Sequence, residues 1–149
     1  MLRRLMATKG GIEMTVLRLA PGVMIGAHAL QKVFGVWNGA GMAGIMAFFT
    51  GVLHMPAWLG YLVIATECFA GLGLVFGVFT RVAAFALFCE MIGAVYMVNF
   101  PNGFFMNWEA KMPAGSEGFE FHILVLAILI AVMIKGGGPA SLDRAVAGT

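Results

Sequence analysis

Four long apolar runs constrain this chain more than any other feature of its sequence. Each run is about 20 residues long, which is the length a helix needs to cross the hydrocarbon core of a bilayer. The runs cover about residues 14–36, 57–79, 80–99 and 118–136. Because an open sheet cannot satisfy its backbone polar groups in lipid, all four are expected to be helices. The sequence therefore predicts an all-α integral membrane protein, built as a four-transmembrane-helix bundle.

The composition agrees with a membrane protein. The 149 residues are 61% hydrophobic and 11% charged, whereas a soluble domain has about 45–50% apolar and about 25% charged residues. We therefore expect a single membrane domain over residues 1–149, with the lipid bilayer as its main partner. The net charge of +2 is too small to indicate a nucleic-acid partner.

The segments outside the runs have distinct patterns. After a Gly-rich turn, "MAGIMAFFTGVLHM" is too short to span and is stopped by Pro56, so a short outer-side helix is expected between the first two spans. Residues 100–117 hold Pro, Asn and Gly with Phe and Trp, which suits an interfacial cap. Arg18 and Pro21 interrupt the first run, so it is expected to be an uncleaved span and not a signal peptide.

The basic residues predict how the chain is oriented in the membrane. Those on one side of the predicted membrane are Arg3, Arg4, Lys9, Arg81, Lys135 and Arg144. Lys111 lies in a loop on the other side. The positive-inside rule then places both termini in the cytoplasm of a multi-pass protein of the cell inner (plasma) membrane. The loops 37–56 and 100–117 are expected to face outward.

Apart from Arg81 and Lys135 at the inner ends of the predicted spans, seven charged or histidine residues fall within them. They are Arg18, His28, Lys32, Glu67, Glu90, Glu120 and His122. Such residues are costly in lipid, so each is expected to face the bundle interior and to have a partner. In the stretch "AHALQKVFG", His28 and Lys32 are four residues apart and share one helix face. Lys32 is expected to face a carboxylate, either Glu120 or Glu67, whereas Arg18 is expected to reach the inner headgroups.

Two acids are predicted at the same depth. The second and third runs are antiparallel around a turn at residues 79–80, which pairs Glu67 with Glu90 and Cys68 with Cys89. At about 1.5 Å per residue the carboxyl groups lie roughly 17 Å from that turn, near the bilayer centre. Two acids there cannot both ionise cheaply unless a cation is near. The two cysteines are expected to be inert packing residues.

Other patterns point to packing. The pairs Gly22/Gly26 and Gly73/Gly77 are expected to allow close helix contacts within the bundle, with a homo-oligomer left open as the alternative. The three histidines fall in separate elements, so no metal site is expected.

An ordered set of motifs resembles the DoxX family of small four-span membrane proteins. The stretch "HALQKVFG" is similar to the family's His-Gly-x-x-Lys-x-Phe-Gly pattern, with Ala29 in place of the glycine. Glu67 is followed by "CFAGLGLVFGVFTRVAA", similar to the family's Gly-rich run and Phe-Thr-Arg turn. The stretches "PNGFF", "GFEFHILVL" and "GPASLD" follow in order, so the resemblance runs from about Ile12 to Ala145.

The resemblance implies a redox role. The family includes a membrane subunit of thiosulfate:quinone oxidoreductase and members that associate with redox enzymes. This chain is then expected to bind a quinone in the bilayer and to pass electrons and protons with a partner oxidoreductase. Catalytic, proton-carrying roles would fall to Glu67 and Glu120. Cofactor-binding roles would fall to His28, Lys32, Arg18 and His122.

Two other functions fit the residues, and whether the chain is itself an enzyme stays open. One is a non-catalytic scaffold or assembly subunit of a larger membrane complex, in which the buried charges only hold the helices together. The other is a small-solute or proton transporter that uses Glu67 and Glu90. The transporter is disfavoured because four spans without an internal repeat make a poor alternating-access machine.

Overall fold

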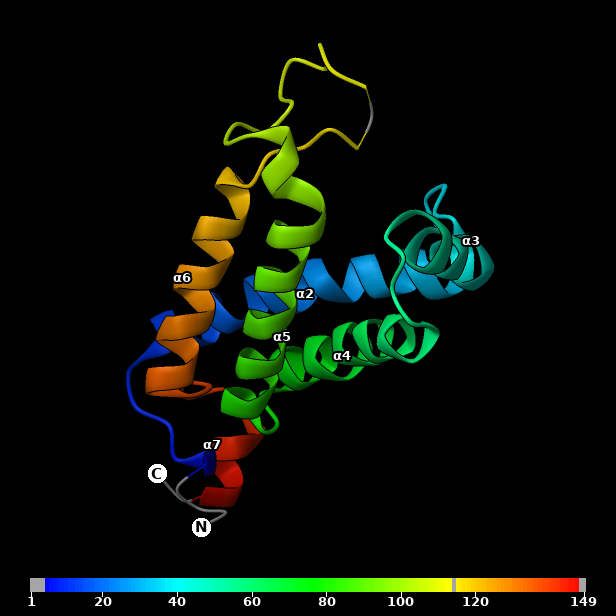
Figure 1. Cartoon of the computed structure of the whole chain (residues 1–149). Helices are drawn as coiled ribbons and strands as arrows, with labels where there is room; N and C mark the ends of the chain where they lie inside the picture. The colour runs from blue at the N-terminus through cyan, green and yellow to red at the C-terminus, as the bar shows by residue number, and fades with distance from the viewer. Residues whose placement is uncertain (1–4, 114, 148–149) are drawn as a thin grey trace.

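The computed structural model describes residues 5–113 and 115–147, and these residues form helices, turns and loops without any strand (Figure 1). The helices are α2 (Ile12–Phe34), α3 (Gly41–Ala47), α4 (Ala57–Phe76), α5 (Thr80–Ala94), α6 (Glu120–Lys135) and α7 (Leu142–Ala147). Two π-helical turns, η1 (Phe48–Val52) and η2 (Val95–Asn99), and the 3₁₀ turn η3 (Phe100–Asn102) complete the set. The all-α prediction is confirmed for the described residues. Arg3 and Arg4, used above to orient the chain, lie outside them.

Two helical segments stand out as candidate membrane spans. Ala57–Phe76 and Thr80–Asn102 are long and apolar enough to cross a bilayer. The apolar segment Gly41–Val52 is shorter, and it is the short helix predicted between the first two runs. Helix α2 has 23 residues but carries Glu13 and Lys32 near its ends and Arg18 within it.

The helices associate as two pairs. Helix α2 packs along α4, while α5 packs against both α4 and α6. In Figure 1 the α2–α4 pair crosses the α5–α6 pair instead of running parallel to it, with α3 at the far end of α2 and α4. The described chain is therefore an assembly of crossed helix pairs, and the predicted four-helix bundle is not confirmed.

Glycines allow α2 and α4 to approach closely. A Cβ atom on Gly22 would lie 3.0 Å from the backbone nitrogen of Val75, and one on Gly71 would lie 3.3 Å from the backbone nitrogen of Gly26. A Cβ atom on Gly73 would lie 3.1 Å from the Cβ of Ala83 on α5. Gly22 and Gly26 are therefore used for packing inside the chain, as predicted, and so is Gly73.

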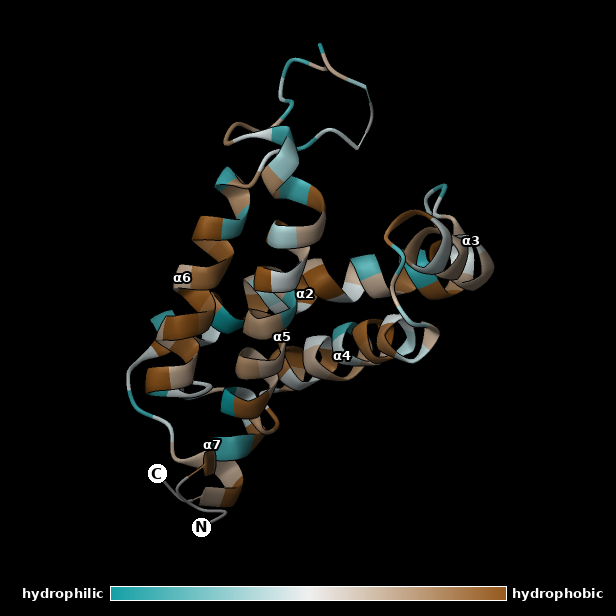
Figure 2. Ribbon diagram, in the orientation of Figure 1, coloured by the Kyte–Doolittle hydropathy of each residue, from teal (hydrophilic) through white to brown (hydrophobic). Residues whose placement is uncertain are grey.

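Apolar side chains fill the contacts between helices and also cover the outside. Leu74, Leu87 and Leu129 are fully buried where α4, α5 and α6 meet. Phe69 and Tyr96 are strongly exposed, and Figure 2 shows hydrophobic residues over most of the ribbon of α4, α5 and α6. Apolar residues on both the inner and the outer face of a helix are typical of a protein surrounded by lipid.

The end of the molecule that carries α7 is held by Arg18. This side chain is only 2% exposed. Its Nε donates to the carbonyl of Gly137 at 2.8 Å and its Nη1 to the carbonyl of Val75 at 2.6 Å. Further bonds run to the carbonyls of Leu74 and Ala140. The guanidinium thus satisfies the last carbonyls of α4, which have no partner inside the helix. The expectation that Arg18 reaches headgroups is wrong, because its donors are used inside the chain.

Asp143 completes the same region, which we call the basal junction (Arg18, Gly77, Asp143). Its carboxylate is 1% exposed and accepts hydrogen bonds from the backbone N–H groups of Phe79 and Thr80, both at 2.8 Å. It thereby caps the start of α5 from a distant part of the chain. Its own N–H donates to the carbonyl of Gly77 at 2.8 Å. Gly77 has φ 68°, and a Cβ there would lie 2.5 Å from the Cβ of Ser141, so only glycine fits this turn.

Replacing the capping carboxylate is expected to weaken the fold. Asp143→Ala removes both acceptors at the start of α5 and should lower the free energy of unfolding by about 1–2 kcal/mol. Thermal unfolding in detergent measures the effect. Arg144→Ala changes the exposed neighbour and serves as the control. Equal midpoints for the two variants would show that the cap does not stabilise α5.

Candidate functional site

A buried ion pair joins α2 to α4. Lys32, in the last turn of α2, donates from its Nζ to Oε1 of Glu67, in the middle of α4. The Glu67 residue is 2% exposed, while the Lys32 side chain keeps 24% of its surface exposed. The close crossing of α2 and α4 brings the two side chains together. Of the two carboxylates predicted to face Lys32, the structure therefore selects Glu67.

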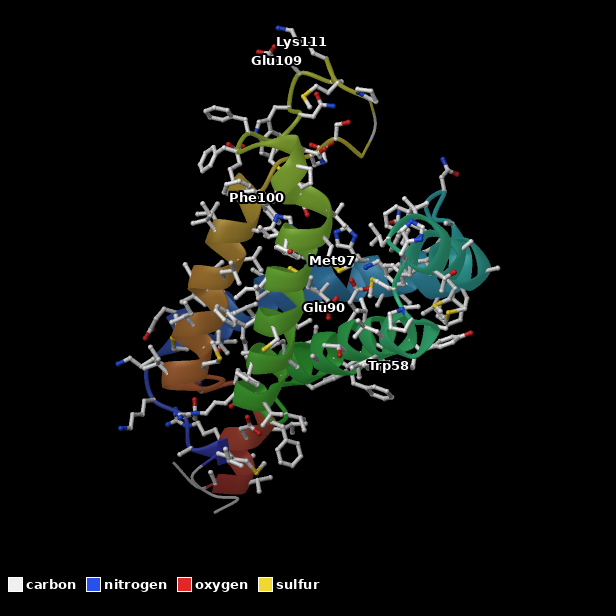
Figure 3. The ribbon with its side chains drawn as sticks, in the orientation of Figure 1. Trp58, Glu90, Met97, Phe100, Glu109 and Lys111 are labelled. Carbon is white, nitrogen blue, oxygen red and sulfur yellow. The ribbon has the colours of Figure 1, made fainter. Side chains whose placement is uncertain are left out.

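Glu90 on α5 is the third member of this group. Glu67 and Lys32 are its charged neighbours, because α5 packs on α4. Figure 3 shows Glu90 where α5 passes α2 and α4. The prediction that Glu67 and Glu90 lie at one depth is confirmed. We call Lys32, Glu67 and Glu90 the carboxyl cluster, in which three helices contribute one cation and two acids.

The carboxyl cluster has unused hydrogen-bonding capacity. The Oε2 atoms of Glu67 and Glu90 are both buried, and neither has a hydrogen-bond partner among the described residues. A buried polar atom without a partner loses its hydration and gains nothing in return, at a cost of about 1–3 kcal/mol. The arrangement is therefore suited to hold a proton or to accept a hydrogen bond from a further group.

The carboxyl cluster can be reached from the protein surface. Lys32 is partly exposed, and Glu90 is half-buried. His28 lies one turn before Lys32 on α2 and is exposed. A molecule lying against this part of α2 would therefore meet an imidazole and an ammonium group, with two carboxyl groups behind the ammonium.

The other predicted site residues lie elsewhere. Glu120, in the first turn of α6, accepts a 2.5 Å hydrogen bond from Nε1 of Trp108 in the 103–119 loop. His122 has a buried Nδ1 without a partner in the described chain. Arg18 belongs to the basal junction, 14 residues before Lys32, which is about 21 Å along a helix. Within the described residues, no hydrogen bond or ion pair joins these three to the carboxyl cluster.

The two cysteines are free thiols. Cys68 is half-buried beside the carboxyl cluster, and Cys89 is exposed on α5. Among the residues that the structure describes, no group of three or more His, Cys, Asp or Glu side chains could hold a metal ion. The chemistry available at the carboxyl cluster is therefore proton exchange and hydrogen bonding by its own side chains.

Two cavities lie away from the carboxyl cluster. An apolar groove of about 550 Å³ runs between α4 and α5 and is lined by residues that include Thr66, Phe69, Phe76 and Phe79. A hollow of about 500 Å³ lies within the 102–112 segment, beside Glu109 and Lys111, at the top of Figure 3. The groove has the size of a small-molecule site, but Thr66 is the one polar side chain among its lining residues, whereas such sites usually have several polar groups that fix a ligand.

Glu90 is the member that sequence reasoning used only in the transporter alternative and left out of the quinone site. The only signal for it was its predicted depth, which matched that of Glu67 across the turn at residues 79–80. That signal was correct, but it did not show which face of α5 carries the side chain. The contact with Glu67 could be found only from the packing of α5 on α4.

Comparisons with known proteins identify the family of this chain. The sequence model of the DoxX family matches residues 14–100, which include Lys32, Glu67 and Glu90 but not Glu120 or His122. The chain is 27% identical over 117 residues to a protein of Bacillus subtilis (strain 168) named "Putative oxidoreductase CatD". That alignment covers 78% of this chain and 75% of the Bacillus protein. No solved structure matches the chain.

Removing the cation is expected to destabilise the protein strongly. Lys32→Met removes the charged partner of Glu67, so this buried acid must either stay charged alone or take up a proton at a cost, and the free energy of unfolding should fall by about 3 kcal/mol. The matched control is Lys111→Met, which breaks the exposed ion pair with Glu109 and should cost less than about 1 kcal/mol. Thermal or denaturant unfolding in detergent compares them.

The double variant Lys32→Met/Glu67→Gln tests the cause of that loss. It removes both charges, so it should recover part of the stability lost in Lys32→Met. A double variant less stable than Lys32→Met would contradict the view that an unpaired carboxylate causes the damage.

Proposed function

This chain belongs to the DoxX family, and from that premise we propose that it is the membrane subunit of a redox system and binds a quinone within the bilayer. The family is membrane-associated, and two helices here are long and apolar enough to cross a membrane. The name of the similar Bacillus protein supports an oxidoreductase setting for this chain.

The carboxyl cluster is the observation that carries this proposal. A quinone head group has two carbonyl oxygens that accept hydrogen bonds, and its two-electron reduction takes up two protons. Lys32 offers a partly exposed ammonium beside the exposed His28. Glu67 and Glu90 each have a buried Oε2 atom without a hydrogen-bond partner among the described residues. Donors at the surface and acids behind them are what such a head group requires.

The residue roles follow from these positions. His28 and Lys32 would donate hydrogen bonds to the head group, and Glu67 would be part of the proton route behind Lys32. When bound, the quinone would supply the two-electron chemistry. The electrons would come from a partner oxidoreductase, because the side chains of the carboxyl cluster carry none. The roles proposed for Glu120, His122 and Arg18 depend on the sequence resemblance, since no described contact joins them to Lys32.

We further propose that α2, α4, α5 and α6 all span the inner membrane. The charged residues of α2 argue against a membrane span. However, Arg18 is hydrogen-bonded to backbone carbonyls, and Lys32 is paired with Glu67. Charges satisfied inside the chain are compatible with a span. The basal junction, near both chain ends in Figure 1, would face the cytoplasm. The 103–119 loop would face outward, with an aromatic surface suited to the membrane interface.

A scaffold subunit is the second candidate. The basal junction supports it, because Arg18 and Asp143 show that this chain uses buried charges to hold its helices together. If the carboxyl cluster has the same purpose, the protein would serve a larger complex by its surface alone. The experiment below separates the two functions.

Quinone binding is tested by mass spectrometry of the lipids extracted from gently purified protein. Wild type and Lys111→Ala should carry a stoichiometric quinone, whereas folded Lys32→Ala should lose it, because the donor beside the head group is gone. His28→Ala should also lower the quinone content and, being a surface change, should leave the fold intact. Absence of quinone from every sample, with one partner protein retained in all of them, would refute quinone binding and leave the scaffold.

The proposed topology is tested by cysteine labelling in intact cells. In a background with Cys68 and Cys89 replaced by Ser, Glu109→Cys should react with a membrane-impermeant maleimide. Arg144→Cys should react only after the membrane is permeabilised. Labelling of Arg144→Cys in intact cells would place the basal junction outside and reverse the orientation.

A further inference from the structure

We propose that Glu67 and Glu90 hold a single proton between them and that Glu90 is the residue through which this proton exchanges. Glu90 is not among the residues that the sequence resemblance points to. The geometry points to it because α5 packs on α4, and each of the two acids has a buried Oε2 atom without a hydrogen-bond partner among the described residues. Glu67 is in turn fixed by its bond from Lys32 on α2.

The buried oxygen atoms of the two acids require a hydrogen-bond donor. Ionised carboxylates have only acceptor oxygens, so two of them cannot hydrogen-bond to each other. The Oε2 atoms of Glu67 and Glu90 are buried and have no donor from any described residue. One proton on the pair supplies the missing donor.

The charge balance also favours one proton. With one proton the two acids carry a single negative charge, which the Lys32 ammonium cancels. With no proton the carboxyl cluster has a net charge of −1, and with two protons it has +1. A net charge within the bilayer is costly, so the neutral state with one proton is preferred.

In the part of the chain that the structure describes, no other charged side chain changes this count. The groups facing Glu90 are Lys32 from α2 and Glu67 and Cys68 from α4. Helix α6 also packs on α5, the helix that carries Glu90. Its Glu120 is hydrogen-bonded to Trp108, and no described ion pair links His122 to Glu67 or Glu90. The proton occupancy is therefore set within the carboxyl cluster itself.

The consequence for reduction depends on the proposed function. Reduction of a bound quinone takes two electrons from the reduced partner oxidoreductase and two protons. The acid pair would donate its proton to a carbonyl oxygen of the head group, leaving two carboxylates beside Lys32. It would then take a proton from solution through the half-buried Glu90 and donate the second. Glu67 stays bonded to Lys32 throughout, so Glu90 is the member that exchanges.

Infrared spectroscopy of the reconstituted, quinone-free protein at neutral pH tests the proton directly. Wild type should show the carbonyl stretch of one hydrogen-bonded carboxylic acid per chain, and this band should shift in D₂O. Glu90→Gln should lose the band, because Glu67 then remains a carboxylate paired with Lys32. Glu120→Gln changes an acid outside the carboxyl cluster and should keep the band.

The opposite results are equally clear. Absence of the band from wild type, or its persistence in Glu90→Gln, would overturn the shared proton. Lys32→Met gives a second check, since loss of the cation should raise the signal from one to two protonated acids per chain. The measurement needs no quinone, so a shared proton without bound quinone would refute the proposed function and leave this inference standing.

Discussion

The cost of a charge surrounded by apolar groups is the constraint on which this structure depends. Arg18 and Lys32 lie on one helix, and each is satisfied by atoms from other parts of the chain. Arg18 collects backbone carbonyls from α4 and from the segment before α7. Lys32 binds the carboxylate of Glu67. Because neither cation can be left alone, the two contacts fix where α2 lies against α4 at two separate points along the helix.

The sequence predicted the helices well because apolar runs and the Pro and Gly residues between them are local signals. It did not predict that the α2–α4 pair crosses the α5–α6 pair, because helices that are apolar all round leave the packing face undefined. Gly22 and Gly71 help to determine the packing faces, since their lack of side chains permits the close approach of α2 to α4.

The same limit applies to the candidate site. Depth along a helix follows from residue number, so the level of Glu67 and Glu90 was predictable. The choice between Glu67 and Glu120 as the partner of Lys32 depends on rotation about the helix axis, which the sequence left open. The role of Arg18 was missed for another reason. Its partners are backbone carbonyls, and because every residue has one, the sequence does not indicate which of them a side chain will bind.

The contrast between the two buried groups argues for chemistry at one of them. In the basal junction, the Arg18 donors and both Asp143 oxygens have partners, as a purely structural contact requires. In the carboxyl cluster two acid oxygens are left unpaired next to a partly exposed lysine. Stability alone would favour removing Glu90, because a second acid adds desolvation without adding a cation. Its presence is explained more simply if the chain needs a proton there than if it needs another brace.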